Sequence, residues 1–123
     1  MATILVIEDS APLRESIAEA LEFCDYQVIQ AEDGKQGLQR TRESHPDLLL
    51  CDIMMPGLDG LEVHRHLRAD PLTADIPIIF LTARTDQRQA VEALGPRVDF
   101  VVKPFQLPDL LTKVRTHLDT SQH

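Results

Sequence analysis

Charged and hydroxyl side chains follow four of the apolar runs in this sequence, at the point where each run ends. Glu8 and Asp9 come directly after the first of these runs, and Asp52 comes after a later one. Thr82 and Lys103 follow the last two. Short, continuously apolar runs are typical of strands buried on both faces. The carboxyl ends of parallel strands meet at one edge of a sheet, so three carboxylates, a hydroxyl and an ammonium group are expected to converge there.

A cluster of this composition can carry phosphoryl chemistry. Three neighbouring carboxylates raise one another's pKa unless a cation lies among them, and oxygen ligands of this kind favour Mg²⁺. Asp52 can then act as a carboxylate nucleophile toward phosphorus. Transfer of a phosphoryl group depends mainly on positioning and on cations around its oxygens, and Lys103 supplies a second cation. The hydroxyl of Thr82 can donate a hydrogen bond to the same group.

The elements that would position these side chains alternate along the chain. Strands are predicted at residues 4–7, 26–29, 48–51, 78–81 and 100–102, the second of them as an edge strand because it alternates. Apolar residues at helical spacing predict a first helix through Leu13, Ile17 and Leu21, and helices over 34–42, 60–68, 86–94 and 107–118. Five strand and helix units predict a doubly wound α/β fold, with a parallel sheet covered by helices on both faces.

Turn-forming residues indicate where several helices begin or end. Asp9 and Ser10 are candidate caps of the first helix, and Asp59 with Gly60 is predicted to form a cap and turn that helps to place Asp52. Pro96 cannot continue a helix, so the helix over 86–94 is expected to be short, shifted or partly unwound.

Composition limits the partners and the location. The 123 residues fit one domain, over 1–123, with no output domain in the chain. A net charge of −8 argues against direct binding to nucleic acid or anionic lipid. The longest apolar stretch, 76–81, is too short to span a membrane, and the start lacks the pattern of a signal peptide. A cytoplasmic protein is expected, with Cys24 and Cys51 as buried, reduced thiols and the histidines at the surface.

Four motifs together resemble those of the receivers of two-component response regulators, across essentially the whole chain. They are ILVIEDS at 4–10, DLLLCDIMMPGLDG at 47–60, IIFLTA at 78–83 and DFVVKPF at 99–105. The resemblance implies a flavodoxin-like fold, which is a five-stranded sheet in the order 2-1-3-4-5 with five helices. It also implies a cis bond between Lys103 and Pro104.

The same resemblance implies a site and a partner. Asp52 would accept a phosphoryl group from a histidine kinase or a phosphotransfer protein. Asp9, Asp52 and the backbone carbonyl of Met54 would bind Mg²⁺, or Mn²⁺, directly, and Glu8 would bind it through water. Lys103 would hold the phosphoryl group.

Signalling is expected to depend on a pair of switch residues, Thr82 and Phe100. In receivers, the hydroxyl at the position of Thr82 moves toward the phosphoryl group and the aromatic ring at the position of Phe100 turns inward. The responding face is formed by the fourth helix, the fifth strand and the fifth helix. It would bind an unidentified downstream protein or output domain, and a phosphorylation-dependent homodimer is compatible with it.

Two other functions remain open at this point. A Mg²⁺-dependent phosphatase with Asp52 as its nucleophile would need a second general acid or base and a substrate-binding cap, and neither is evident. A degenerate receiver acting as a constitutive interaction module would lack part of the acidic, hydroxyl and lysine set, which is complete here. We therefore expect a signalling domain that is not an enzyme and that catalyses only its own phosphorylation and dephosphorylation.

The lifetime of the phosphorylated state is expected to depend on two positions. Met54 lies two residues after Asp52, and Arg84 lies two residues after Thr82. In receivers, the side chains at these two positions flank the phosphoryl group. Met54 cannot orient an attacking water by a strong hydrogen bond, and Arg84 can add a charge-assisted contact. These features favour a long-lived phosphoaspartate. The alternative is that Met54 packs on its loop and Arg84 lies in solvent.

Overall fold

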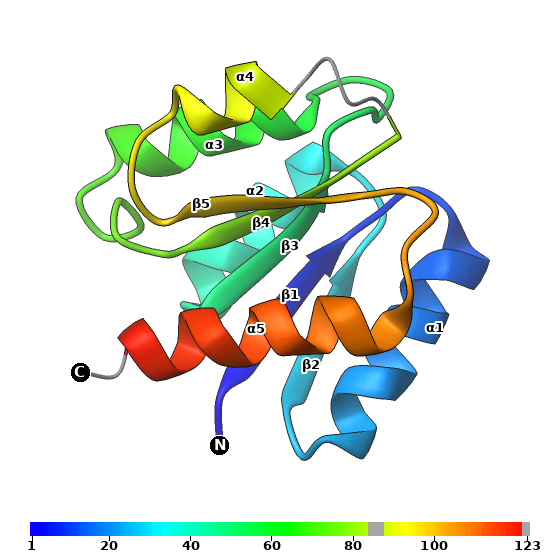
Figure 1. The fold of residues 1–123 in the computed structure, drawn as a ribbon. Coiled ribbons are helices and arrows are strands. Elements are labelled where there is room, and N and C mark those ends of the chain that lie inside the picture. The colour runs from blue at the N-terminus through cyan, green and yellow to red at the C-terminus, as the bar shows by residue number, and fades with distance from the viewer. Residues whose placement is uncertain (84–87, 122–123) are drawn as a thin grey trace.

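The chain folds into one parallel sheet between two layers of helices (Figure 1). The computed structural model describes residues 1–83 and 88–121, so Arg84 lies outside the described residues. The strands are in the order β2-β1-β3-β4-β5, as predicted. Their bounds are β1 Thr3–Ile7, β2 Gln27–Ala31, β3 Leu48–Asp52, β4 Ile78–Thr82 and β5 Val98–Val102.

Helices cover both faces of the sheet, which confirms the doubly wound arrangement. Helices α1 (Ala11–Phe23) and α5 (Leu107–Ser121) lie on one face, and α2 (Gly34–Ser44), α3 (Gly60–Ala69) and α4 (Arg88–Glu92) lie on the other (Figure 1). Among the described residues, no helix has the length and apolar character needed to cross a membrane.

Two hydrophobic cores form because successive strand residues point to opposite faces. In β3, Leu48 and Leu50 join the core under α1 and α5, whereas Leu49 and Cys51 join the core under α2 and α3. Every residue of β3 and of β4 is buried, as expected for central strands, while β2 at the edge is only partly buried. The central strands are therefore fixed on both faces, and their carboxyl ends are rigid supports for side chains.

The region before β5 departs from the sequence-based prediction in its extent. Within the described residues, helix α4 ends at Glu92, which agrees with the predicted shortening at this end, and its predicted continuation to Leu94 is wrong. Its predicted start at Asp86 lies outside the described residues. Gly95 and Arg97 both have positive φ angles, of 96° and 67°. This turn around Pro96 lets β5 begin at Val98, two residues earlier than predicted.

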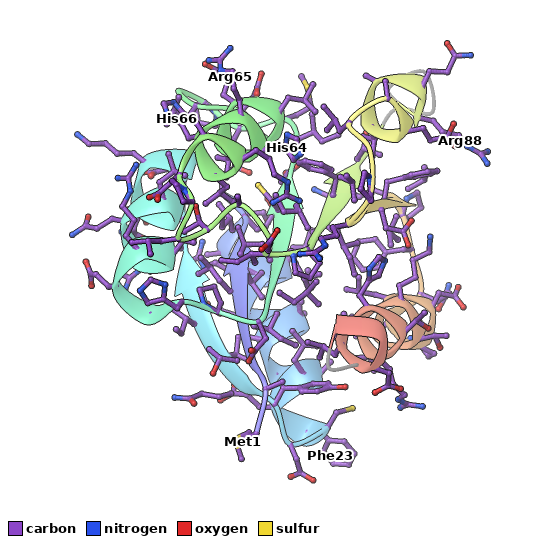
Figure 2. The ribbon with its side chains drawn as sticks, turned by 90° about the vertical axis from the view of Figure 1, so that its left-hand side faces the viewer. Met1, Phe23, His64, Arg65, His66 and Arg88 are labelled. Atoms are coloured by element: carbon purple, nitrogen blue, oxygen red, sulfur yellow. The ribbon has the colours of Figure 1, made fainter. Side chains whose placement is uncertain are left out.

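Three side chains differ from their predicted environments. Ser10 occupies the N-cap position of α1, but its side chain makes no capping hydrogen bond, so that expected contact is wrong. Cys24 is only half-buried, although Cys51 is buried and both thiols are free. His64 is buried rather than exposed: it points toward the sheet while Arg65 and His66 point outward (Figure 2).

Candidate functional site

Four parallel strands end side by side at one edge of the sheet, and the candidate residues lie there. Asp52 is the last residue of β3 and pairs with Leu81, next to Thr82 at the end of β4. Glu8 follows β1 directly, and Lys103 follows β5. The register keeps these strand ends level, because Ile7 pairs with Cys51 and Thr82 pairs with Val102.

Lys103 connects two of the carboxylates. Its Nζ donates hydrogen bonds to Oε1 of Glu8 over 2.8 Å and to Oδ2 of Asp52 over 3.0 Å. Glu8 is fully buried and Asp52 is 5% exposed, so both charges are held away from bulk water. Burial lowers the pKa of Lys103, but the hydrogen bonds and charges of the two acids raise it by more, and the net shift is upward. The ammonium group therefore stays charged and offsets part of the buried negative charge.

A third carboxylate completes an acidic cluster at the solvent side. Glu8, Asp9 and Asp52 each offer an oxygen atom, and these atoms all lie within 4.8 Å of one another. The pKa of Asp9 is raised by a hydrogen bond with the Glu8 carboxyl group, by partial burial and by the charge of Glu8. The cluster thus holds more negative charge than Lys103 neutralises. A donor set of carboxylate oxygens with one exposed member fits a hard divalent cation such as Mg²⁺.

The loop after β3 is folded back on the strand end by the start of α3. The amide of Met54 donates to Oδ1 of Asp52 over 3.1 Å, and the amide of Gly60 donates to the carbonyl of Ile53 over 2.9 Å. Asp59 caps α3 in a capping box with Glu62, as its turn chemistry predicts. Met54 itself is 55% exposed. With Lys103 on one oxygen and the Met54 amide on the other, the carboxylate of Asp52 has a fixed orientation.

Backbone contacts hold Glu8 in position. Its amide donates to the carbonyl of Ala31 over 3.1 Å, and its Oε2 accepts from the amide of Ser10 over 3.2 Å. Nη1 of Arg14 donates to the Glu8 carbonyl over 2.8 Å. Arg14 was not among the residues that the sequence singled out. Its place one turn into a helix that follows an acidic strand end was the signal that could have found it.

Thr82 and Phe100 lie on the same face of adjacent strands. Phe100 pairs with Phe80, which precedes Thr82 by two residues and packs in the same core. Thr82 is 1% exposed. Phe100 is half-buried, with the guanidinium carbon of Arg88 at 5.3 Å and Nζ of Lys113 at 5.4 Å from its ring centroid. Two cations from α4 and α5 therefore contact the candidate switch ring.

A second ion-pair network lies beside this ring, and sequence reasoning missed it. Asp99 accepts from Nζ of Lys113 over 2.9 Å, and its other oxygen lies 3.0 Å from Nε2 of His117. His117 is therefore half-buried and paired, and its predicted surface position is wrong. Burial raises the pKa of Asp99, but the hydrogen bonds from His117 and Lys113 lower it by more, and the net shift is downward. The network ties β5 to α5.

Comparison with known proteins agrees with this arrangement. The family model of the response regulator receiver domain matches residues 4–115. The chain belongs to the response regulator receiver family. The cis peptide bond between Lys103 and Pro104, which the resemblance implied, is present in this receiver.

Relatives of the receiver include two groups of named regulators. It is 40% identical over 117 residues to the phosphate regulon transcriptional regulatory protein PhoB of Pseudomonas aeruginosa, covering 94% of this chain and 51% of that protein. It is 42% identical over 116 residues to the response regulator MprA of Mycobacterium ulcerans, covering 94% of this chain and 49% of that protein. The receiver thus spans about half the length of these relatives.

Solved structures share the same fold. The chemotaxis protein CheY4 of Vibrio cholerae is 29% identical, with a TM-score of 0.87 and coverage of 94% of this chain and 98% of that one. The signal receiver domain of a histidine kinase from Syntrophus aciditrophicus is 31% identical, with a TM-score of 0.87 and coverage of 98% and 92%. The flavodoxin-like architecture of receivers is therefore established for this chain.

Proposed function

We propose that this receiver accepts a phosphoryl group on Asp52 from a histidine kinase or a phosphotransfer protein and passes the signal to a partner protein. The observation that carries the proposal is the contact of Lys103 with both Glu8 and Asp52, beside a cluster of three carboxylates. Nucleophile, cation and candidate metal ligands thus share one strand edge. In the transfer, an Asp52 oxygen forms a bond to phosphorus, the bond between phosphorus and the donor's imidazole nitrogen breaks, and the imidazole leaves.

The residues of the chain have separate roles in this step. The carboxylates of Asp9 and Asp52 and the backbone carbonyl of Met54 would hold Mg²⁺ or Mn²⁺, and Glu8 would act through water. When bound, the metal would supply positive charge to the phosphoryl oxygens. Lys103 would hold another phosphoryl oxygen, since its Nζ already lies 3.0 Å from Oδ2 of Asp52. Thr82 would donate to the group from the end of β4.

The signal is proposed to leave through the face formed by α4, β5 and α5. Thr82 and Phe100 lie on one face of neighbouring strands, so movement of the hydroxyl toward a phosphoryl group would leave space behind it for the ring. The downstream reader is a protein or an output domain, and a second phosphorylated copy of the receiver is one such reader. Free Cys24 and Cys51 suit the reducing cytoplasm, which is the location we propose.

The phosphodonor is proposed to dock on an apolar groove between α1 and the segment after β5. A pocket of about 530 Å³ here is lined by Leu13, Ser16, Lys103, Phe105 and Leu107, among others. Lys103 lines this groove and also contacts Asp52, so it links the groove to the candidate phosphoacceptor. An apolar helical face carrying a phosphorylated histidine fits a surface of this kind.

The docking step can be tested separately from the chemistry. Phe23 lies near the groove, lines an adjoining pocket with Ser16 and Leu107, and is 90% exposed. Phe23→Ser should slow phosphorylation by a histidine kinase that acts on the wild-type receiver. It should leave phosphorylation by a small phosphodonor unchanged. Equal rates with the kinase for both proteins would contradict the proposed docking surface.

The chemical proposal is tested by incubation with acetyl phosphate and Mg²⁺, followed by intact mass measurement. Wild-type receiver should gain one phosphoryl group, and Asp52→Asn should gain none. Asp25→Asn is a matched control, since Asp25 is exposed, and it should behave as wild type. Normal uptake by Asp52→Asn, or uptake by wild type in excess EDTA, would contradict the assignment. Steady turnover of a phosphate ester would instead favour a phosphatase.

A further inference from the structure

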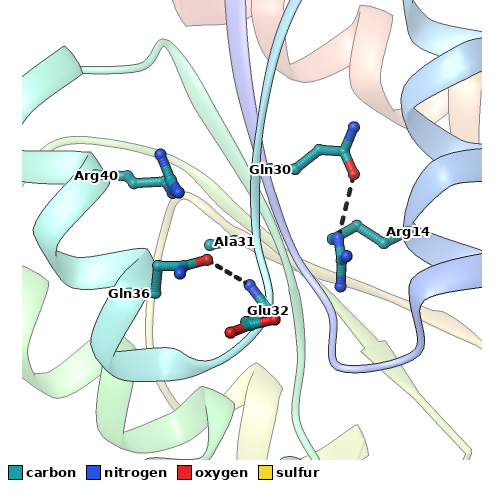
Figure 3. Close-up of a pocket in the computed structure, with 6 residues that line it drawn as sticks. All are labelled: Arg14, Gln30, Ala31, Glu32, Gln36 and Arg40. Atoms are coloured by element: carbon teal, nitrogen blue, oxygen red, sulfur yellow. Dashed lines mark hydrogen bonds between the residues drawn. The ribbon is translucent and has the colours of Figure 1, made fainter.

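A polar pocket lies across the outer edge of the sheet, and none of the three clustered carboxylates lines it. It has a volume of about 290 Å³ and spans the end of β2 between α1 and α2 (Figure 3). Its lining residues come from these three elements and from the position directly after β2: Arg14, Gln30, Ala31, Glu32, Gln36 and Arg40. Because β2 is an edge strand, no further strand of the described sheet covers this end.

The pocket holds a cation whose hydrogen bonding is incomplete. Nε of Arg40 is buried and has no hydrogen-bond partner among the described residues. A buried donor on a charged group is costly to leave unpaired, and a ligand oxygen that the guanidinium group turned to meet would satisfy it. Arg40 therefore indicates an acceptor that the described part of the chain does not provide.

The other lining groups are also donors. Nε of Arg14 donates to Oε1 of Gln30 over 3.1 Å, and the amide of Glu32 donates to Oε1 of Gln36 over 2.9 Å (Figure 3). With each glutamine oxygen engaged, the group that remains on each side chain is an NH₂ donor. The lining thus combines two guanidinium groups and two amide NH₂ groups with one carboxylate, that of exposed Glu32. This local excess of donors and positive charge contrasts with a chain of net charge −8.

We infer that this pocket binds a small phosphate-bearing ligand. Guanidinium groups pair with phosphate in a planar, two-point geometry, and a phosphate has enough acceptor oxygens to serve two guanidinium groups and an amide together. A volume of about 290 Å³ is enough for a small organic phosphate. The site is separate from the proposed phosphoacceptor and does not depend on it. Contacts that link it directly to that region include the hydrogen bond from Nη1 of Arg14 to the Glu8 carbonyl and the hydrogen bond from the Glu8 amide to the carbonyl of Ala31.

The test is a titration of the whole receiver, in EDTA, with glycerol phosphate and separately with inorganic phosphate, followed by NMR. The Nε–H signal of Arg40 should shift, together with the backbone amides of Glu32 and Gln36. Arg40→Gln should weaken binding by roughly ten- to a hundred-fold. Arg42→Gln is the matched control, because Arg42 is exposed on the same helix and its loss removes the same charge. It should bind nearly as wild type.

Three results would overturn the inference. One is an unshifted Arg40 Nε–H signal at tens of millimolar ligand, on the order of the weakest specific binding. Another is equal weakening in Arg40→Gln and Arg42→Gln, because that outcome indicates attraction by net charge alone. The third is binding of acetate as tight as that of either phosphate, because the pocket would then select carboxylates. Circular dichroism of both variants establishes that they fold.

Discussion

Gly60, the first residue of α3, lies directly against the backbone of Asp52. A Cβ atom at position 60 would lie 2.6 Å from the carbonyl oxygen of Asp52 and 2.8 Å from Cα of Ile53. Both neighbours are backbone atoms of a buried strand end, so they cannot move aside as a flexible side chain would. The glycine allows α3 to begin close enough to β3 to position the candidate phosphoacceptor.

Gly60→Ala should therefore lower the free energy of unfolding by about 1–3 kcal/mol, the usual cost of overpacking. Phosphorylation by acetyl phosphate should also slow, since Asp52 must shift. Gly57→Ala is the comparison. Position 57 has open space around it but a φ of 77°, so its cost should come from backbone strain alone, at about 1–2 kcal/mol. Urea denaturation measures the free energy of unfolding of both variants. An unchanged phosphorylation rate in Gly60→Ala would contradict the positioning role.

Lys103→Met should make the stability of the receiver depend strongly on Mg²⁺. The substitution leaves Glu8 and Asp52 buried without their ammonium partner, which costs roughly 3–5 kcal/mol when a buried pair is broken. A divalent cation at the acidic cluster would replace the lost charge. The melting temperature should therefore fall in EDTA and recover with Mg²⁺ by more than it does in wild type. Equal Mg²⁺ responses of the two proteins would show that the cation does not bind near Lys103.

His64 should make the receiver less stable in mild acid. Burial and the charge of Arg68 lower the pKa of His64 below its ordinary value of 6.5. The folded protein thus holds the neutral imidazole, whereas the unfolded chain takes up a proton as the pH falls through 6.5. Stability should decrease from pH 6.5 downward until the pH reaches the lower pKa of the folded state.

His64→Leu should remove this part of the pH dependence, and thermal denaturation between pH 7 and pH 5 measures it. His66→Gln is the control, because His66 is exposed on the same helix and should leave the pH profile unchanged. If the stability of His64→Leu decreased with falling pH as steeply as that of wild type, another group would be responsible for the pH dependence.

Asp99 should stabilise the junction of β5 and α5 at neutral pH and lose this effect in acid. The pKa of Asp99 is lowered below 3.8, so its contribution is complete above that value and is lost as the pH falls through the folded-state pKa. Asp99→Asn should therefore be less stable than wild type at pH 7. The difference between the two proteins should shrink below about pH 3.8. Urea denaturation at pH 7 and below about pH 3.8 measures the free energy of unfolding of both proteins. A difference between the two proteins that is the same at both pH values would argue against the ion-pair network.

Met54 should control the lifetime of the phosphorylated receiver. Hydrolysis needs a water placed in line behind phosphorus, and Met54 cannot orient one. Met54→Asn should speed loss of phosphate by about tenfold or more, because misplacing the attacking group costs orders of magnitude in rate. Leu72→Asn also replaces an exposed apolar side chain with an amide, at a position outside the site, and should have no effect. If wild type, Met54→Asn and Leu72→Asn all lost phosphate at the same rate, Met54 would not limit the access of water.

Sequence patterns predicted the sheet and the strand-end residues because both follow from local rules. Apolar runs, four of them followed by a charged or hydroxyl residue, are visible without knowledge of packing, and parallel strands bring those residues together. The capping residue Asp59 was predicted for the same reason, because its contact with Glu62 spans three positions.

Other features depend on packing between distant segments and could not be predicted in this way. His64 is buried because α3 packs against β4, where the ring centroid of Phe80 lies 6.2 Å from that of His64. The pairing of Asp99 with Lys113 and His117 depends on where β5 begins, which the turn around Gly95 decides. The contact of Arg14 with the Glu8 carbonyl depends on the angle at which α1 leaves β1.

The most direct test of the account is to locate the phosphoryl group on the chain. Sodium borohydride reduces an acyl phosphate to a primary alcohol, so it converts a phosphorylated aspartate to homoserine and leaves other aspartates intact. The wild-type receiver would be phosphorylated with acetyl phosphate and Mg²⁺, reduced, digested and sequenced by tandem mass spectrometry. We predict homoserine at position 52 and at no other position. Homoserine at position 9 or 59 instead, or phosphate retained on a serine, threonine or histidine, would contradict it.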